Sequence, residues 1–160
     1  MEIYLFAIID YAYLVRILGS HDRYVKNLLK KLLGYRFNTS RQYTLVEYAA
    51  GYAQIDGVIL SPSGNIAVEI ESRTAKQVRG AILDLFFHEA KKKLLIIVPE
   101  HMYDPYALRK DAKYILNILK KIKPDIIFKV VTLRGSGSNP KPNDDLTLLK
   151  EAIKELQANP

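Results

Sequence analysis

Three acidic residues in the middle of the chain, Asp56, Glu69 and Glu71, have a spacing that could assemble a metal site. Two apolar segments rich in β-branched residues flank the turn formers at 61–64, so residues 54–71 are predicted to form a β-hairpin. With a four-residue loop, Asp56 pairs with Glu69, and Glu71 follows on the same strand face because strand side chains alternate. Paired carboxylates supply the hard oxygen ligands that suit Mg²⁺.

The predicted pairing has an electrostatic cost. Directly opposed residues of an antiparallel pair lie about 5 Å apart at Cβ. Two like charges at that distance repel by roughly 3 kcal/mol at an effective dielectric near 20. A bound divalent cation would remove this repulsion. The alternative is a surface hairpin whose acidic residues point to solvent, or pair with Arg73 and Lys76 just downstream.

Basic residues follow the acidic strand. Arg73, Lys76 and Arg79 recur at three-residue intervals around a predicted helix start, where Thr74 and Gln77 have the spacing of a capping box. The three cations could hold a nucleic-acid backbone or neutralise charge that develops on a phosphoryl group. Lys76, one helical turn from the strand end, is the predicted catalytic cation. The alternative is that the three simply balance the charge of the acidic strand.

A fourth carboxylate could come from the segment before the hairpin. Residues 43–48 alternate as a short strand with Tyr43, Leu45 and Glu47 on one face. A turn at Gly51 would let this strand pair beside the hairpin and complete an antiparallel three-strand meander. Glu47 would then lie close enough to the other carboxylates to serve as a metal ligand.

The other predicted elements alternate between helices and strands. The continuous apolar run at 94–99 is typical of a strand buried on both faces, and the helix before it predicts a crossover that leaves this strand parallel to the Glu69 strand. Residues 134–145, rich in Gly, Ser, Pro and Asn, are predicted to form a flexible connection. The helix that begins near Thr74 is expected to end at the lysines at 91–93, and a last strand is expected at 126–133. Further helices are expected at 2–18, 20–33, 105–121 and 145–156.

Composition limits the classes of function. The chain has 160 residues, of which 49% are hydrophobic, enough to bury one core, so a single domain is expected. It contains no cysteine, which excludes disulfides, thiolate chemistry and cysteine-based zinc sites and suits the reducing cytoplasm. No Gly-rich phosphate loop, HExxH signature or GxSxG elbow is present, which argues against nucleotide hydrolysis, metalloprotease and esterase chemistry.

Charge and hydropathy point to a partner. The net charge of +7 favours an anionic partner, most commonly a polyphosphate backbone. The apolar segment 2–18 has no basic region before it and is interrupted by Asp10 and Arg16, so we expect a largely buried helix and no membrane partner. An interfacial or oligomer-forming helix is the alternative.

The predicted elements follow one another as helix, strand, strand with Asp, strand with ExE, helix and buried strand. This order resembles the core of the PD-(D/E)XK nucleases, the superfamily of type II restriction enzymes and archaeal Holliday junction resolvases. Ile55-Asp56 stands for the usual Pro-Asp, and Glu69-Ile70-Glu71 stands for (D/E)xK. The resemblance covers about residues 20–99, with 1–19 and 100–160 as additions to the single domain. It implies an α/β, restriction endonuclease-like fold: a mixed central sheet with the antiparallel three-strand meander, a crossover helix and a parallel buried strand, flanked by helices.

One position departs from the family pattern. Glu71 occupies the third motif position, where Lys is usual, and the resulting ExE pair resembles that of the restriction enzyme BamHI, whose upstream Glu could be matched by Glu47. In other members of the superfamily the cation moves to the following helix, which would suit Lys76 or Arg73.

The resemblance implies an endonuclease that depends on Mg²⁺, with Mn²⁺ as a substitute, and that acts most readily on double-stranded DNA as a homodimer. Asp56 and Glu69 would hold the metal, with Glu47 contributing to a second site, and Glu71 would orient or deprotonate the attacking water. Arg73, Lys76 and Arg79 would bind the nucleic acid. Two alternatives remain: a nucleic-acid-binding module that keeps the nuclease fold without chemistry, and a protein-interaction domain whose basicity is incidental.

Overall fold

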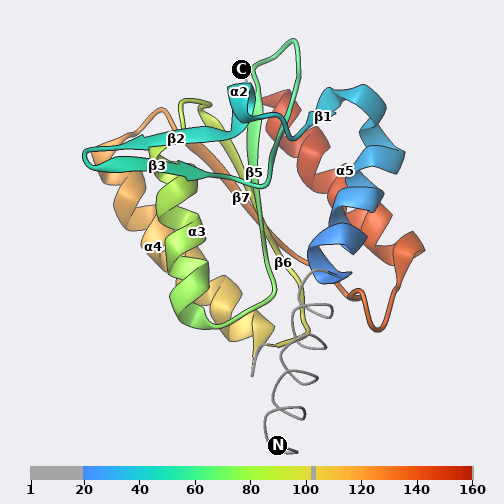
Figure 1. Ribbon diagram of the computed structural model, residues 1–160. Helices are drawn as coiled ribbons and strands as arrows, with labels where there is room; N and C mark the ends of the chain where they lie inside the picture. Colours follow the sequence, from blue (N-terminus) through green and yellow to red (C-terminus); the bar gives the residue numbers. More distant parts are fainter. Residues whose placement is uncertain (1–19, 102–103, 160) are drawn as a thin grey trace, which may run out of the picture.

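The computed structural model describes residues 20–101 and 104–159, so the helix predicted at 2–18 lies outside the described residues (Figure 1). The strands are β1 (Phe37–Asn38), β2 (Leu45–Tyr48), β3 (Gly51–Gln54), β4 (Gly57–Ile59), β5 (Ile66–Glu71), β6 (Lys92–Ile97) and β7 (Ile127–Thr132). The helices are a helix over residues 20–33, the 3₁₀ turn η1 (Gly34–Arg36), and α2 (Arg41–Thr44), α3 (Ala75–Phe87), α4 (Pro105–Ile122) and α5 (Pro142–Ala158).

Five of the strands form one mixed sheet in the order β1-β4-β5-β6-β7, and β2 and β3 form a separate two-stranded ribbon. β4 and β5 pair antiparallel with Val58 opposite Ala67, as the predicted four-residue loop requires. β5, β6 and β7 are parallel neighbours. Because parallel strands need crossover connections, α3 and α4 lie between them in the sequence. The predicted α/β class, the mixed sheet and the parallel buried strand are confirmed.

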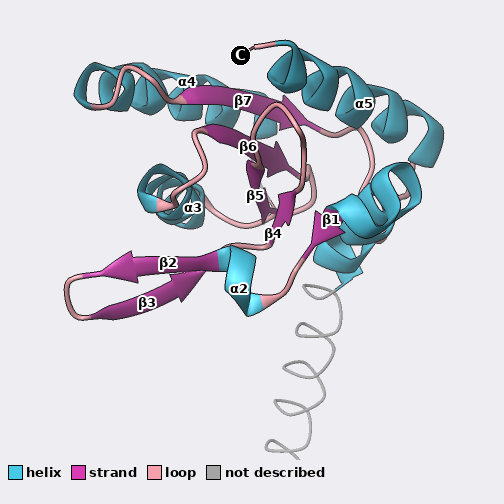
Figure 2. Cartoon of the chain, turned by 90° about the horizontal axis from the view of Figure 1, so that it is seen from above, coloured by secondary structure: helices cyan, strands magenta, loops and turns pink. Residues whose placement is uncertain are grey.

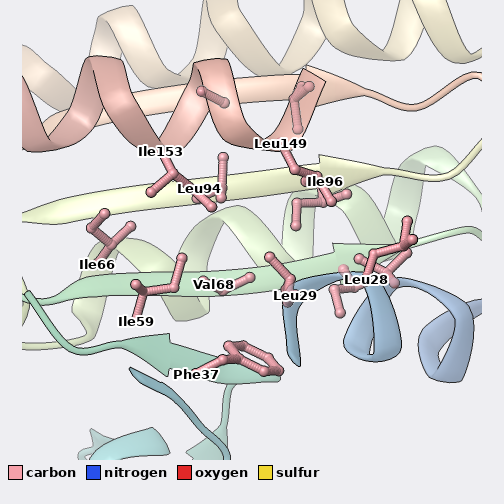
Figure 3. Close-up of a cluster of buried hydrophobic side chains, with 14 of the residues drawn as sticks. Leu28, Leu29, Phe37, Ile59, Ile66, Val68, Leu94, Ile96, Leu149 and Ile153 are labelled. Carbon is pink, nitrogen blue, oxygen red and sulfur yellow. The ribbon is translucent and has the colours of Figure 1, made fainter. Parts of the chain in front are cut away.

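Helices cover both faces of the large sheet (Figure 2). The 20–33 helix and α5 pack on one face, where Leu29, Val68, Ile96 and Ile153 belong to one buried cluster (Figure 3). On the other face α3 and α4 pack over a second cluster that includes Ile82. Every residue of β5 and β6 is buried. The apolar run that starts at Leu94 in β6 therefore follows from the position of this strand between two helical layers.

The predicted meander has a different first strand. β4 pairs with β1, placing Phe37 opposite Ile59, and the segment expected as a strand from residue 43 begins as helix α2 and continues into the separate ribbon. Gly57 makes room for this pairing, since a Cβ there would lie 2.4 Å from the Phe37 ring. The antiparallel part of the sheet is therefore β1-β4-β5, and the prediction that the Glu47 strand joins it was wrong.

The lysines expected at the end of the third helix belong to a strand instead. α3 ends at Phe87, and Lys92 and Lys93 begin β6. Both are buried, but each ammonium group reaches a backbone acceptor: Nζ of Lys92 donates to the carbonyl of Ser63 at 2.6 Å, and Nζ of Lys93 to that of His88 at 2.5 Å. A lysine stem can pack like an aliphatic side chain when its head finds a partner. The charge pattern alone was misleading here.

The connection at 134–145 has defined contacts, although its composition predicts flexibility. The buried carboxylate of Asp145 accepts hydrogen bonds from the backbone N–H of Arg134 at 2.7 Å and of Gly135 at 3.1 Å, and from the hydroxyl of Tyr24 at 2.7 Å. These contacts join the connection to α5 and to the 20–33 helix. No helix within the described ranges is long and apolar enough to cross a membrane.

Candidate active site: an acidic pocket

Asp56, Glu69 and Glu71 line a pocket of about 350 Å³ between the 20–33 helix, β5 and α3. We call it the acidic pocket. The polar residues that line it come from every element around it: Asp22, Gln54, Asp56, Glu69, Glu71, Arg73, Gln77 and Asp84. Segments separated by more than sixty residues in the sequence thus supply carboxylates to one cavity.

Asp56 and Glu69 meet inside this pocket. The pairing of Gly57 with Val68 puts the next residue of each arm, Asp56 and Glu69, at the end of the β4–β5 ladder. Oδ2 of Asp56 accepts the backbone N–H of Ile70 at 2.9 Å, and its carboxylate is hydrogen-bonded to the side chain of Glu69. The structure therefore brings together the two residues that the hairpin pattern pairs.

The Glu69 carboxyl group is in an environment that opposes ionisation. Its residue is 8% exposed. Burial raises the pKa of Glu69 far above its ordinary value, and the hydrogen bond and negative charge of Asp56 raise it further, with smaller contributions from Asp84 and Glu71. Without a bound cation, the Glu69 carboxyl group therefore keeps its proton at neutral pH.

Glu71 is held in one orientation. Its Oε1 accepts hydrogen bonds from the backbone N–H of Ser72 at 3.0 Å and of Arg73 at 2.8 Å. The guanidinium of Arg73 adds a fork, with Nε 2.8 Å from Oε1 and Nη2 2.9 Å from Oε2. Such a two-point contact fixes the plane of the carboxylate as well as its position. Arg73 is therefore engaged within the protein, as its proximity to the acidic strand suggested.

A lysine that the sequence pattern did not single out contacts one of the pocket carboxylates. Nζ of Lys26, on the 20–33 helix, lies 2.7 Å from Oδ1 of Asp56. The pair is largely shielded from solvent, with 31% of the lysine side chain and 17% of the aspartate side chain exposed. In the sequence, Lys26 is followed on the same helix by Lys30 and Lys31, and lysines spaced in this way usually face solvent. Only the packing of the helix against the sheet reveals its contact with the hairpin.

Two further carboxylates were also missed. Burial, then the charge of Asp56, raise the pKa of Asp22 to about 6. On α3, Oδ1 of Asp84 accepts the hydroxyl of Tyr48 at 2.5 Å. A helical signal existed for both: Asp22 precedes Lys26 by four residues, and Asp84 follows Gln77 by seven, so each pair shares a helix face. This spacing identifies pocket residues only once it is known which strand each helix face packs against.

Three predicted site residues lie elsewhere. Glu47 is exposed on the separate ribbon; its neighbour Tyr48 points to Asp84, and strand alternation turns Glu47 away. Lys76 and Arg79 are exposed on α3 and do not line the acidic pocket, because the helix turns Gln77 toward it instead. Arg79 lines a separate groove between α3 and α4.

Comparison with protein-family models, with curated proteins and with solved structures finds no match to this chain. Its chemistry must be inferred from the site. Carboxylates that converge at the end of a hairpin, with one lysine and one arginine among them, can bind a cation or hold and transfer a proton.

The carboxylate oxygens of the acidic pocket are ligands of the kind that Mg²⁺ prefers, but they are not arranged as a complete coordination shell. In the part of the chain that the structure describes, no group of three or more His, Asp or Glu side chains is arranged to hold a metal ion. The reason is visible in the contacts. Glu69 is neutralised by a proton, Asp56 by Lys26 and Glu71 by Arg73. A divalent cation could take the place of the proton between Asp56 and Glu69, since carboxylate oxygens are its preferred ligands.

Proposed function

We propose that the protein is a metal-dependent endonuclease with a restriction endonuclease-like core, hydrolysing phosphodiester bonds most readily in DNA. The observation that carries the proposal is the meeting of Asp56 and Glu69 in a pocket that also contains Glu71. Supporting it, the antiparallel pair β4–β5 is followed by a helix and by the parallel strand β6, the order that the family resemblance implies.

Asp56 and Glu69 would hold Mg²⁺, and Asp22 lies in the same pocket as a further oxygen donor. When bound, Mg²⁺ or Mn²⁺ would offset the charge of the phosphodiester and lower the pKa of the attacking water. Glu69 must lose its proton for this to occur, so metal binding is coupled to proton release. The burial that raises the pKa of Glu69 also keeps its oxygens from competing solvent.

The other charged residues have separate tasks in this proposal. Glu71, fixed by Arg73, orients the attacking water or accepts its proton. Lys26 supplies the positive charge that the third motif residue carries in the family, and it does so from the preceding helix. A lysine ammonium near the reacting phosphate would stabilise the charge that develops in the transition state.

Nucleic acid is the substrate that the charge of the chain favours. The net charge is +7, and Lys76 and Arg79 are exposed near the start of α3, where they could contact a phosphate backbone beside the acidic pocket. Cutting both strands of a duplex requires two sites, so we propose a twofold dimer for cleavage of double-stranded DNA.

A second function, nucleic-acid binding without cleavage, is favoured by one specific observation. Lys26 and Arg73 already neutralise two of the three motif carboxylates, and Glu71 stands where the family has its lysine. A pocket stabilised in this way needs no metal to remain folded. The protein would then bind DNA through its basic surface alone.

A plasmid assay distinguishes the two. Supercoiled DNA is incubated with Mg²⁺ or Mn²⁺ and the wild type, Asp56→Ala, Glu69→Ala, or Glu151→Ala, an exposed acidic control on α5. Nicking by the wild type and the control that both pocket variants lose supports the nuclease. Salt-sensitive binding without nicking supports the binding module. The absence of both activities excludes both functions.

A further inference from the structure

A second pocket, distinct from the acidic pocket, is lined by cations. It has a volume of about 280 Å³ and lies between α4 and β7, the outer strand of the large sheet. Arg109, Lys113, Asn117 and Lys120 of α4 form its polar lining; Lys129 of β7 also borders it, but the Lys129 ammonium pairs with Glu155 of α5. None of the described residues that line the pocket is acidic. We call it the basic pocket. It shares no residue with the acidic pocket.

The cations of α4 project from one side of the helix. Lys113 follows Arg109 by four residues and Lys120 follows Lys113 by seven, the spacings that repeat one helical face. At 1.5 Å per residue, the row from Arg109 to Lys120 extends over about 16 Å. Without a bound anion, like charges gathered along one cavity repel each other.

Protein groups leave most of this charge without a counterion. Glu155 forms an ion pair with Lys129, but within the described ranges no ion pair involves Arg109, Lys113 or Lys120. The Nε atom of Arg109 is buried and has no hydrogen-bond partner. Buried donors are rarely left unpaired, because the loss of their hydration is not compensated. An anion in the pocket would supply the missing acceptor.

A buried hydroxyl on β7 adds to this observation. Oγ1 of Thr132 is also buried without a partner. Strand alternation puts Thr132 on the same face of β7 as Phe128 and Val130, which line the basic pocket. Thr132 does not itself line the basic pocket, so Nε of Arg109 is the buried unpaired donor at the pocket, and Oγ1 of Thr132 lies further along the same strand face.

The floor of the basic pocket is apolar. It consists of Leu116 on α4 and of Ile126, Phe128 and Val130 at β7. Binding sites for small ligands commonly combine such a floor with a few polar groups that fix orientation. In this pocket Leu116, Ile126 and Val130 are buried and Phe128 is half-buried. Cations beside a partly accessible aromatic ring suit a ligand with a phosphate at one end and a planar ring at the other.

We propose that the basic pocket binds the phosphate of a nucleotide unit, either as a free nucleotide or within a nucleic-acid strand, with the base or sugar over the apolar floor. This site requires neither a metal nor the acidic pocket. It therefore stands independently of the proposed nuclease activity, and Glu69→Gln should leave it intact.

Titration of the full chain with dAMP tests the site, in the presence of a chelator that removes divalent cations. Binding is followed by calorimetry and by the backbone amide signals of Asn117 and Phe128. Deoxyadenosine, which lacks the phosphate, is the ligand control, and a short single-stranded oligodeoxynucleotide is the second probe. Tighter binding of dAMP identifies a free nucleotide site, and tighter binding of the oligonucleotide identifies a strand site; both support the proposal.

Variants on α4 locate the binding. Lys113→Ala and Lys120→Ala should each weaken the preferred probe about tenfold, the effect of losing one charge-assisted hydrogen bond. Lys110→Ala and Lys121→Ala remove the same charge from exposed positions of the same helix that do not line the pocket, and should bind like the wild type. Circular dichroism verifies that each variant is folded, and Arg109→Lys provides a conservative change at the buried contact.

Three results would overturn the proposal: no binding of either probe, equal binding of dAMP and deoxyadenosine, or equal losses in the pocket and control variants. The last would show that general positive charge, rather than the basic pocket, attracts the ligand. A loss of binding in Glu69→Gln would move the ligand to the acidic pocket and overturn the assignment as well.

Discussion

The ammonium of Lys26 lies 2.7 Å from the carboxylate of Asp56, although thirty residues separate them in the sequence. The contact joins the 20–33 helix to the start of the β4–β5 hairpin. It puts a positive charge beside the acidic pair. In the nuclease family that the sequence resembles, lysine is usual at the strand position that Glu71 occupies here. If the protein cleaves DNA, Lys26 is the residue best placed to compensate for that substitution.

Lys26→Ala should therefore lower the rate of metal-dependent nicking by about 10²–10³-fold, the usual effect of removing one electrostatic stabiliser from an active site. DNA binding should remain close to that of the wild type, because many other cations remain. Lys30→Ala, which removes an exposed lysine one helical turn further on, should leave the rate unchanged. Equal rates for all three proteins would exclude a catalytic role for Lys26.

Glu69→Gln should stabilise the fold at neutral pH while abolishing cleavage. In the folded protein, burial and Asp56 raise the pKa of Glu69 above its ordinary value of 4.5. Folding then binds a proton, so the stabilising contribution is complete below about pH 4.5 and is lost as the pH rises toward the folded pKa. Glutamine has no proton to lose. We expect a gain of about 0.5–2 kcal/mol in the free energy of unfolding near pH 7, measured by urea denaturation.

The two proteins should converge in stability at about pH 4, where the Glu69 of the unfolded wild type is also largely protonated. Destabilisation of Glu69→Gln at neutral pH would show that Glu69 is ionised in the folded state, in contradiction to the environment described for it.

Metal binding should strengthen with increasing pH. A divalent cation must displace the proton that Glu69 holds, so affinity should rise by up to about tenfold per pH unit for each proton released. Titrating Mn²⁺ calorimetrically in two buffers that differ in ionisation enthalpy measures that release directly. The variant Asp56→Ala should not bind Mn²⁺, and no proton release should accompany the titration. Affinity that is independent of pH would mean that the cation binds away from Glu69.

The hairpin and its acidic pair could be predicted because both depend on neighbours in the sequence. Alternation and loop length fixed the pairing of Val58 with Ala67, from which the meeting of Asp56 and Glu69 follows. The parallel strand β6 was equally accessible, since the continuous apolar run at 94–99 is typical of a strand buried on both faces.

The rest of the pocket depends on tertiary packing. β1 has two residues, too few to show a period, yet it takes the edge of β4 where the Glu47 strand was expected. Asp22, Lys26 and Asp84 each lie on a helix whose pocket-facing side is set by the sheet beneath it. Their charges suggest a solvated surface when the sequence is considered alone. Only the packed structure distinguishes these residues from the exposed Lys76.

The buried lysine at the start of β6, Lys93, should make the stability of the fold depend on pH. Lys93 is fully buried, and this burial lowers its pKa to about 7. The unfolded chain binds more protons than the folded one between about pH 7 and the ordinary pKa of 10.5, so stability should increase across that window. The slope from this group is at most about 1.4 kcal/mol per pH unit. Lys93→Met should remove this pH dependence of stability, measured by chemical denaturation at several pH values. Lys91→Met, at an exposed position, should retain it. The same slope in the wild type and in Lys93→Met would show that Lys93 ionises normally.

The structure and the sequence pattern point to different additional carboxylates for the metal site: Asp22 in the structure and Glu47 in the sequence pattern. Asp22 lines the acidic pocket with a pKa raised to about 6 by burial and by Asp56, whereas Glu47 is exposed on the separate ribbon. Asp22→Asn should therefore weaken Mn²⁺ binding and slow nicking by roughly 10–100-fold, the range for residues that support metal ligands. Glu47→Gln, the same chemical change, should alter neither. The opposite result, with Glu47 required and Asp22 dispensable, would mean that the β2–β3 ribbon moves to the pocket when DNA binds and that the sequence pattern identified the metal ligand correctly.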